Sequence, residues 1–332
     1  MRLFPATAAC AAAIVMTSAT AGAQPAPPLD RNVLHVQVIL DKLGFGPGVL
    51  DGRGGQSLVA ALKGFQQSRG LAVTGKPDPA TLRALYPYRN ARPTITIALT
   101  KDMVRGPFMG VIPRDYGKQA ELPVLGYRSP MEKLAEMFHT TPAVLMELNS
   151  PQTRIAEGAR VTLPNALPTS RDYPADMSAD WRQTLTMLNV DANSPKGDSI
   201  VVDKSDGVLR VLDKQGKIVG QFSVTTGSSH DPLPLGSWKI YGSDYNPKFH
   251  YNPSLFWDAK KGDDKAMLPP GPNGPVGVVW IDLSKEHYGI HGTPEPSTIG
   301  RSESHGCIRL TNWDVARLTL MIPKGARAVF QA

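Results

Sequence analysis

The residues best suited to chemistry lie near the C-terminal end of the chain. Three histidines come shortly before a cysteine, Cys307, in the sequence: His287, His291 and His305. A free thiol is only slightly ionised at neutral pH, and a nearby imidazole can activate it by taking its proton. Gly306 lets a substrate carbonyl approach the main chain, whose N–H groups could stabilise an oxyanion. The pattern predicts a cysteine nucleophile that performs acyl transfer.

The same residues allow two other interpretations. His287 and His291, with His305 and Cys307, supply three nitrogens and one sulfur, a set acceptable for zinc. A lone cysteine can also be an inert buried thiol. The neighbouring glycine and histidines favour the nucleophile, so we expect no metal. Other histidines are isolated and are expected on the surface or satisfied by local partners: His35, His139, His230 and His250.

Two segments carry a family resemblance. Ile290-His291-Gly292-Thr293 and Ser304-His305-Gly306-Cys307-Ile308-Arg309 resemble the signature of the L,D-transpeptidase catalytic domain of the YkuD type. The resemblance covers residues 197–330 and implies a mainly β domain. Leu233 stands where the family usually has threonine, and we expect a structural rather than a chemical consequence of this departure.

The resemblance also implies roles for single residues. Cys307 would be the nucleophile and His291 the general base, oriented through the backbone carbonyl of Gly292. The remaining oxyanion and substrate-binding residues would lie beside the nucleophile: Ser304, His305, Gly306 and Arg309. Arg309 would hold the loop or a substrate carboxylate, because its planar guanidinium suits bidentate pairing.

The family's reaction attacks the tetrapeptide stem of peptidoglycan between diaminopimelate and the terminal D-alanine. D-alanine leaves, a thioester forms, and the side-chain amine of another stem takes the acyl group; no cofactor is needed. The acceptor is left open among a stem peptide, the lysine of an outer-membrane lipoprotein, a free D-amino acid and water. An L,D-carboxypeptidase using the same thioester and a non-catalytic wall-binding protein are the alternatives, and the intact His291 and Cys307 favour the enzyme.

The elements that must position these residues indicate a mainly β domain. Apolar residues in alternation predict strands, two pairs of which are joined by the turns Asp206-Gly207 and Gln215-Gly216. The expected strands are 200–202, 208–212, 218–224, 237–241, 276–281 and 288–291. A helix is expected from Thr311, and its N-terminal dipole would favour a thiolate at Cys307 if the chain turns that way.

Upstream, residues 31–87 predict a small all-α module of three helices. Asp30 and Asp78 are expected to cap the first and third helices, and Leu82 and Leu85 of the third to face the core. The module resembles the three-helix peptidoglycan-binding domain in five ordered groups: Leu43-Gly44-Phe45, Asp51-Gly52, Phe65-Gln66, Gly70-Leu71 and Val73-Thr74-Gly75. It departs from the family at Gly54 and Ser57. Peptidoglycan is the partner that this resemblance implies.

Residues 95–165 predict a second small module, of the α+β class. Ser129 and Glu132 form a capping box, Thr141 begins another helix, and a strand follows at 160–163. The order is similar to a degenerate LysM module, which binds the glycan of peptidoglycan. Residues 166–196 are predicted to be a linker with one short helix.

The first residues of the chain indicate export. Residues 1–23 combine Arg2, an apolar stretch and the cleavage pattern Ala21-Gly22-Ala23, as in a signal peptide. Cleavage would remove one of the two cysteines, leaving Cys307 alone, and would lower the net charge from +7 to +6. A mildly basic exported protein suits an anionic cell wall and argues against nucleic acid. We therefore expect a multidomain periplasmic protein, associated with the wall and not spanning the membrane.

Overall fold

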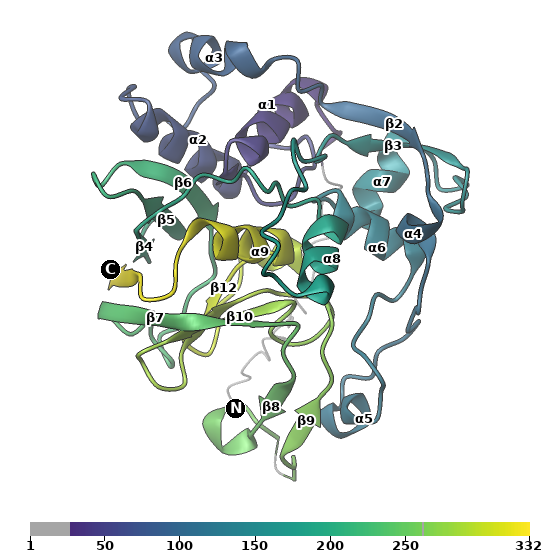
Figure 1. Cartoon of the computed structure of the whole chain (residues 1–332), viewed down its shortest axis with the longest axis vertical. Helices are drawn as coiled ribbons and strands as arrows, with labels where there is room; N and C mark the ends of the chain where they lie inside the picture. The colour runs from purple at the N-terminus through teal and green to yellow at the C-terminus, as the bar shows by residue number, and fades with distance from the viewer. Residues whose placement is uncertain (1–26, 261) are drawn as a thin grey trace, which may run out of the picture.

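The computed structural model describes residues 27–260 and 262–332. The expected signal peptide at residues 1–23 lies outside the described residues. Within the described part, no helix is both long and apolar enough to cross a lipid bilayer. Figure 1 shows helices at the N-terminal end of the chain packed beside a large sheet that belongs to its C-terminal half.

A nine-stranded mixed sheet forms the centre of the C-terminal half. Its order is β1-β6-β5-β4-β13-β7-β10-β11-β12. The strands are β1 Phe45–Gly46, β4 Ser199–Asp203, β5 Val208–Leu212, β6 Ile218–Ser223, β7 Gly236–Tyr245, β10 Val279–Leu283, β11 Gly289–His291, β12 Ile308–Arg309 and β13 Arg327–Gln331. Isolated bridges join Thr225 to Arg309 and Gly227 to Ser304. The sheet therefore curls until its last strand meets the segment that follows β6.

The main core lies against helix α9 (Asn312–Met321), which is buried along almost its whole length. The helix begins where it was expected, and the Thr311 side chain caps it by accepting a hydrogen bond of 3.1 Å from the Asp314 N–H. Helix α8 (Ala179–Met187) packs into the same core through Trp181 and Leu185, which are 1% and 0% exposed. The segment expected to be a linker thus contributes apolar surface to the core.

The N-terminal module contains α1 (Arg31–Lys42), α2 (Gln56–Ser68) and α3 (Pro79–Leu85), followed by the 3-10 helix η1 (Tyr86–Tyr88). Asp30 and Asp78 cap α1 and α3 through their side chains, as expected. The expectation that Leu82 faces the core is wrong, because this side chain is 47% exposed. Instead, α3 buries Thr81 and Leu85. A helical module preceding a mainly β domain is confirmed.

Helix α1 has two buried faces. Ile39 and Leu40 pack in the core of their own module. Leu34 and Val38 pack instead with Leu134 and Phe138 of the next module. The first two modules therefore share α1 as a common wall.

The middle module pairs β2 (Thr94–Ala98) with β3 (Arg160–Pro164) in antiparallel register. Its helices are α4 (Lys101–Val104), α5 (Tyr116–Ala120), α6 (Pro130–Met137) and α7 (Pro142–Leu148). Ser129 caps α6 by accepting a hydrogen bond from the Glu132 N–H at 3.2 Å. The two helices followed by a strand lie where the sequence predicted them; the likeness to LysM stays a prediction.

One segment of this module, residues 105–128, extends away from its other elements. It carries α5, which packs on the hairpin formed by β8 (Phe249–Tyr251) and β9 (Ala266–Leu268). Figure 1 shows α5 beside β9, far from α6 and α7. We call residues 105–128 the arm. Two short 3-10 helices, η2 (Pro253–Leu255) and η3 (Pro296–Thr298), complete the fold.

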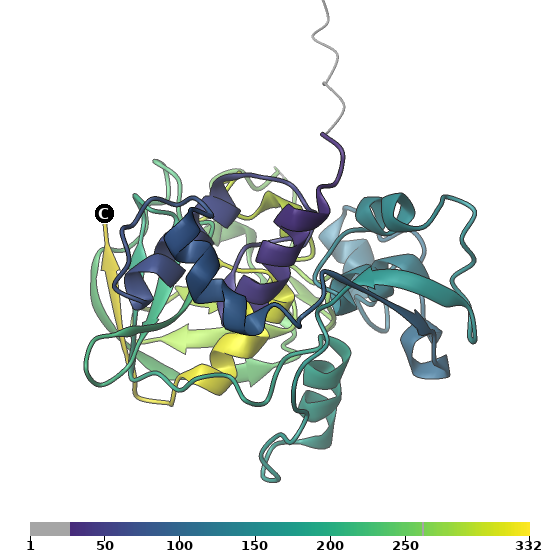
Figure 2. The ribbon, with the colours of Figure 1, turned by 90° about the horizontal axis from the view of Figure 1, so that it is seen from above.

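Three modules meet at one buried polar cluster. Asp41 of α1 pairs with Arg317 of α9 (Oδ1 to Nη2, 3.3 Å) and with His139 of the middle module (Oδ2 to Nδ1, 3.0 Å). The His139 ring also donates from Nε2 to the Leu188 carbonyl at 2.7 Å. Figure 2 shows the N-terminal helices above α9 with the middle module to one side. The cluster fixes the relative positions of the three modules.

Candidate active site

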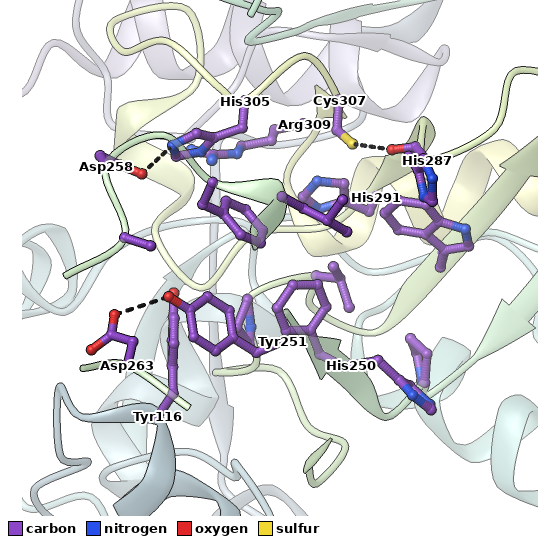
Figure 3. A pocket seen from close by; sticks show the side chains of 18 of the residues that line it. Tyr116, His250, Tyr251, Asp258, Asp263, His287, His291, His305, Cys307 and Arg309 are labelled. Atoms are coloured by element: carbon purple, nitrogen blue, oxygen red, sulfur yellow. Dashed lines mark hydrogen bonds and ion pairs between the residues drawn. The ribbon is translucent and has the colours of Figure 1, made fainter. Parts of the chain in front are cut away.

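A pocket with a volume of about 860 Å³ opens beside Cys307. Four of the predicted site residues line it: His291, His305, Cys307 and Arg309. They come from β11, β12 and the loop before β12, which the parallel pairing of Ile290 with Ile308 places side by side. Figure 3 shows their side chains around the upper part of the pocket.

His291 is held in one tautomer and is 5% exposed. Its Nδ1 lies 2.7 Å from the Gly292 carbonyl oxygen, which can only accept, so Nδ1 carries the proton and Nε2 has a free lone pair. The Trp280 ring stacks on the imidazole at 5.5 Å between centroids. Burial, assisted by the positive charge of Arg309, lowers the pKa of His291 to about 4. The imidazole is therefore neutral at physiological pH and can accept a proton.

The surroundings of Cys307 disfavour the thiolate. Its Sγ lies 3.9 Å from the His287 carbonyl oxygen, and no hydrogen bond joins it to His291 among the described residues. Burial raises the pKa of the thiol. The effect of the α9 dipole on Cys307 stays a prediction: β12 lies between Cys307 and the start of α9, and burial opposes ionisation of the thiol. A neutral imidazole that can accept the thiol proton lies in the same pocket, at His291.

The loop before Cys307 is shaped by two of the predicted residues. The Ser304 hydroxyl donates to the Cys307 carbonyl at 2.5 Å, and the Ser304 N–H donates to the Thr226 carbonyl at 3.1 Å. Gly306 has a φ of +96°, and a Cβ there would lie 2.5 Å from the Tyr288 ring. Neither residue lines the pocket, and their contacts determine the conformation of the loop that carries the thiol.

His305 and Arg309 differ in how far their charges are matched. His305 Nε2 lies 2.8 Å from Asp258 Oδ1, an interaction drawn in Figure 3. Arg309 donates weakly, at 3.5 Å, to the Glu303 carbonyl, and in the described chain it forms no ion pair with a carboxylate. The pocket therefore contains a guanidinium able to bind an anion.

Asn312 supports the His291 loop, a role that the sequence did not reveal. A Cβ on Gly292 would lie 2.0 Å from Asn312 Oδ1, so the glycine is required for this packing. Asn312 Oδ1 also accepts from the Val278 N–H at 3.2 Å, and its Nδ2 donates to Glu136 Oε1 at 2.8 Å. Glu136 belongs to α6, so the middle module contributes to the back of the site. In the sequence, Asn312 is only the residue that follows the expected helix start at Thr311.

The structure also bears on the departures and alternatives noted above. Leu233 is 3% exposed and packs in the main core, so the departure from threonine affects the packing of the core. The zinc interpretation finds no support in the geometry. In residues 27–260 and 262–332, no three His, Cys, Asp or Glu side chains are grouped to hold a metal ion. His305 instead pairs with Asp258, and the His287 side chain is 63% exposed.

Comparison with known proteins gives two family matches. A model of the L,D-transpeptidase catalytic domain (YkuD) matches residues 197–330. A model described as a putative peptidoglycan binding domain matches residues 30–85.

Curated relatives and solved structures carry related names. The putative L,D-transpeptidase YqjB of Bacillus subtilis is 30% identical over 135 residues, which are 39% of this chain and 69% of that protein. The putative L,D-transpeptidase YkuD of Bacillus licheniformis is 55% identical over 58 residues, 18% of this chain and 35% of that protein. The chain thus spans about a third of the length of the Bacillus YkuD proteins that it matches. A solved L,D-transpeptidase from Xylanimonas cellulosilytica is 16% identical with a TM-score of 0.37, covering 92% of this chain and 99% of that chain.

Proposed function

Because this chain belongs to the L,D-transpeptidase family, we propose that it is a peptidoglycan L,D-transpeptidase acting in cell-wall biogenesis or remodelling. One observation carries the proposal: Cys307 and His291 line the same pocket, and the Nε2 lone pair of His291 is free. We further propose export to the periplasm through the signal peptide at residues 1–23.

In the first half of the reaction, His291 Nε2 takes the proton from Cys307 Sγ while the sulfur attacks the diaminopimelate carbonyl. The carbonyl oxygen becomes an oxyanion, which main-chain N–H groups around Gly306 and Cys307 stabilise. The C–N bond to D-alanine then breaks, and the imidazolium returns its proton to the leaving amine. A thioester at Cys307 remains, and His291 is neutral again.

In the second half, an amine attacks the thioester carbonyl and gives its proton to His291. The C–S bond breaks, and the thiolate of Cys307 recovers the proton. The depressed pKa of His291 suits both halves, because the imidazole stays neutral between proton transfers. The site uses only this chain's own residues and needs no cofactor.

We assign binding of peptidoglycan to the N-terminal module, residues 31–87, and glycan binding to the middle module, residues 95–165. The resemblance of the first module and its family match support the former assignment. The two modules would deliver wall polymer to a catalytic domain whose position relative to them is fixed by the Asp41, His139 and Arg317 cluster.

The direct test is covalent labelling by a carbapenem, read by intact mass. We expect a lasting adduct on the purified protein and none on Cys307→Ala. An unmodified wild-type protein that is folded would contradict the enzyme and favour a non-catalytic wall-binding protein.

The acceptor is identified by analysing muropeptides from a strain that lacks the gene. Loss of 3–3 cross-links indicates transfer to another stem peptide, which is the acceptor we propose. Accumulation of tetrapeptides without loss of cross-links would instead indicate an L,D-carboxypeptidase. Loss of lipoprotein from the wall would indicate the lysine of an outer-membrane lipoprotein.

A further inference from the structure

The arm brings residues of the middle module to the wall of the catalytic pocket. Arg114, Asp115 and Tyr116 line the same pocket as Cys307 and His291. Nearly two hundred residues separate them in the sequence, and the LysM resemblance gives the arm no task. Because the arm lines the pocket, its residues can contact whatever the pocket binds.

The arm is anchored to the catalytic domain by its backbone. The Leu125 N–H donates to the Pro270 carbonyl at 2.9 Å, and the Asn273 N–H donates to the Leu125 carbonyl at 2.9 Å. A Cβ on Gly271 would lie 2.3 Å from the Leu125 carbonyl oxygen, so the approach of the two segments requires glycine there. The arm is a fixed part of the pocket wall.

Tyr116 itself is held by an apolar cluster. Its ring packs on Tyr251 of β8, with 4.3 Å between ring centroids. Leu125, Tyr251 and Leu268 form the buried centre of this cluster. In Figure 3 the Tyr116 side chain rises from the lower wall toward the side of the pocket where His305 and Arg309 lie. The phenol is thus oriented before any ligand enters.

Arg309 and Tyr116 line the same pocket, and Arg309 is the cation whose charge acts on the phenol. Burial raises the pKa of Tyr116 and lowers that of Arg309, and each group's charge opposes the other's shift. The two carboxylates whose charges act on Tyr116 already have partners: Asp258 pairs with His305, and Asp263 accepts from the Tyr251 hydroxyl at 3.0 Å. A half-buried guanidinium without a carboxylate partner in the described chain gains most from a carboxylate supplied by a ligand.

We propose that Tyr116 and Arg309 together form a subsite for a carboxylate of the acyl-donor stem peptide. This subsite rests on the proposed transpeptidase function. The donor, rather than the acceptor, fits because Arg309 follows the nucleophile by two residues and pairs in register with His291. A peptide held there presents a neighbouring carbonyl to Cys307. The donor offers two such carboxylates, that of the diaminopimelate side chain and that of the terminal D-alanine.

The test measures acylation of the full-length protein by tetrapeptides, using rapid quenching and intact mass. Three donors are compared: one with both carboxylates free, one amidated on diaminopimelate and one amidated on D-alanine. For Tyr116→Phe and the free donor, we expect half-saturation at about 10–150-fold higher concentration and a limiting rate within about twofold of wild type, as for loss of one hydrogen bond to a charged group. The amidated donor that lacks the relevant carboxylate should bind wild type and Tyr116→Phe equally.

The amidated donor that binds wild type and Tyr116→Phe equally identifies the carboxylate that the subsite binds. Tyr241→Phe is the matched control, since Tyr241 is 51% exposed and does not line the pocket. Equal half-saturation of wild type and Tyr116→Phe on all three donors overturns the subsite while leaving the transpeptidase intact. A change only in the later transfer to an amine overturns assignment to the donor. A folded wild type that no tetrapeptide acylates overturns the proposed function and the subsite with it.

Discussion

Two buried histidines of this chain each stack on a tryptophan. His291 lies on Trp280 at 5.5 Å between centroids, and His139 lies on Trp313 at 5.0 Å. Both ring nitrogens of His139 face acceptors, the Asp41 carboxylate and the Leu188 carbonyl. His291 engages only Nδ1, with the Gly292 carbonyl, and its Nε2 is left for the pocket.

The difference distinguishes a histidine that joins modules through both ring nitrogens from one that keeps a ring nitrogen free to accept a proton. Around His139, the Asp41 carboxylate and the Arg317 guanidinium complete a closed network in which both carboxylate oxygens of Asp41 have a partner. Around His291, burial acts without a compensating carboxylate and lowers the pKa to about 4. The same side chain in similar packing therefore joins modules when both nitrogens are engaged and accepts protons when one is free.

The largest effect is expected at the free nitrogen. His291→Ala should lower the rate of acylation by about 10²–10⁴-fold, the usual contribution of a general base, with the denaturation midpoint changed little. The measurement is the rate of adduct formation by intact mass. His230→Ala is the control, because its side chain is 60% exposed and does not line the pocket. Near-wild-type acylation by His291→Ala would break the assignment of the free nitrogen to catalysis.

A substitution in the closed network should lower the stability of the protein rather than its rate of acylation. Asp41→Ala leaves the buried Arg317 charge without its carboxylate and removes the Asp41 partner of the His139 ring, which should cost about 3–5 kcal/mol of unfolding free energy. Urea denaturation measures it, with Asp176→Ala, an exposed loop position, as the control. Molecules that remain folded should keep their rate of acylation. A loss below about 0.5 kcal/mol, the range of ordinary surface changes, would show that the network does not fasten the modules.

Glu136, on α6 of the middle module, is a further buried titratable group. Burial raises its pKa from 4.5 to about 7, so the native state prefers the protonated form. Its stabilising contribution is present below pH 4.5 and is lost as the pH rises through about 7. Glu136→Gln, which cannot ionise, should therefore be more stable than wild type by about 2–3 kcal/mol at pH 8 and nearly equal at pH 4.5. Parallel urea curves at the two pH values measure this, and a gain of equal size at both would refute the titration.

The smallest effect concerns pH and the reactive histidine. Since the pKa of His291 is lowered to about 4, its base form is present above that pH. Acylation should be level from about pH 5 to 7 and fall about tenfold per unit below 4. Intrinsic fluorescence checks that the protein stays folded, because the stabilising contribution of Asp41, whose pKa is lowered, disappears only as the pH falls through that lowered value. A fall in rate already near pH 6.5, the ordinary pKa of histidine, would contradict the depressed pKa.

Local rules predicted much of the fold. Asp30, Asp78 and Thr311 cap helices because a side-chain oxygen and the next turn lie within a few residues. Most of the strands followed from alternation of apolar residues. The prediction that Leu82 faces the core was wrong, because its helix is short and the side that is exposed depends on neighbours that the sequence does not identify.

Sequence reasoning found the candidate site residues that lie together in short segments of the chain. Cys307, His291 and Arg309 come from two short segments and meet in the pocket as expected. Tyr116 and Asn312 could not be found in this way, because their contacts join distant parts of the chain and neither stands in a pattern. His139 was expected to be isolated, and only the fold brings Asp41 to it.

The two-residue strand β1 has a consequence for the behaviour of the chain in solution. Through Phe45 and Gly46 the N-terminal module pairs with β6, at the edge of the sheet. At the other end, β12 is short and is bridged to Thr225. Unpaired edges are templates for strand addition between molecules. A fragment beginning at residue 197 would uncover β6 and tend to aggregate, so the N-terminal module also shields an open edge of the sheet from strand addition.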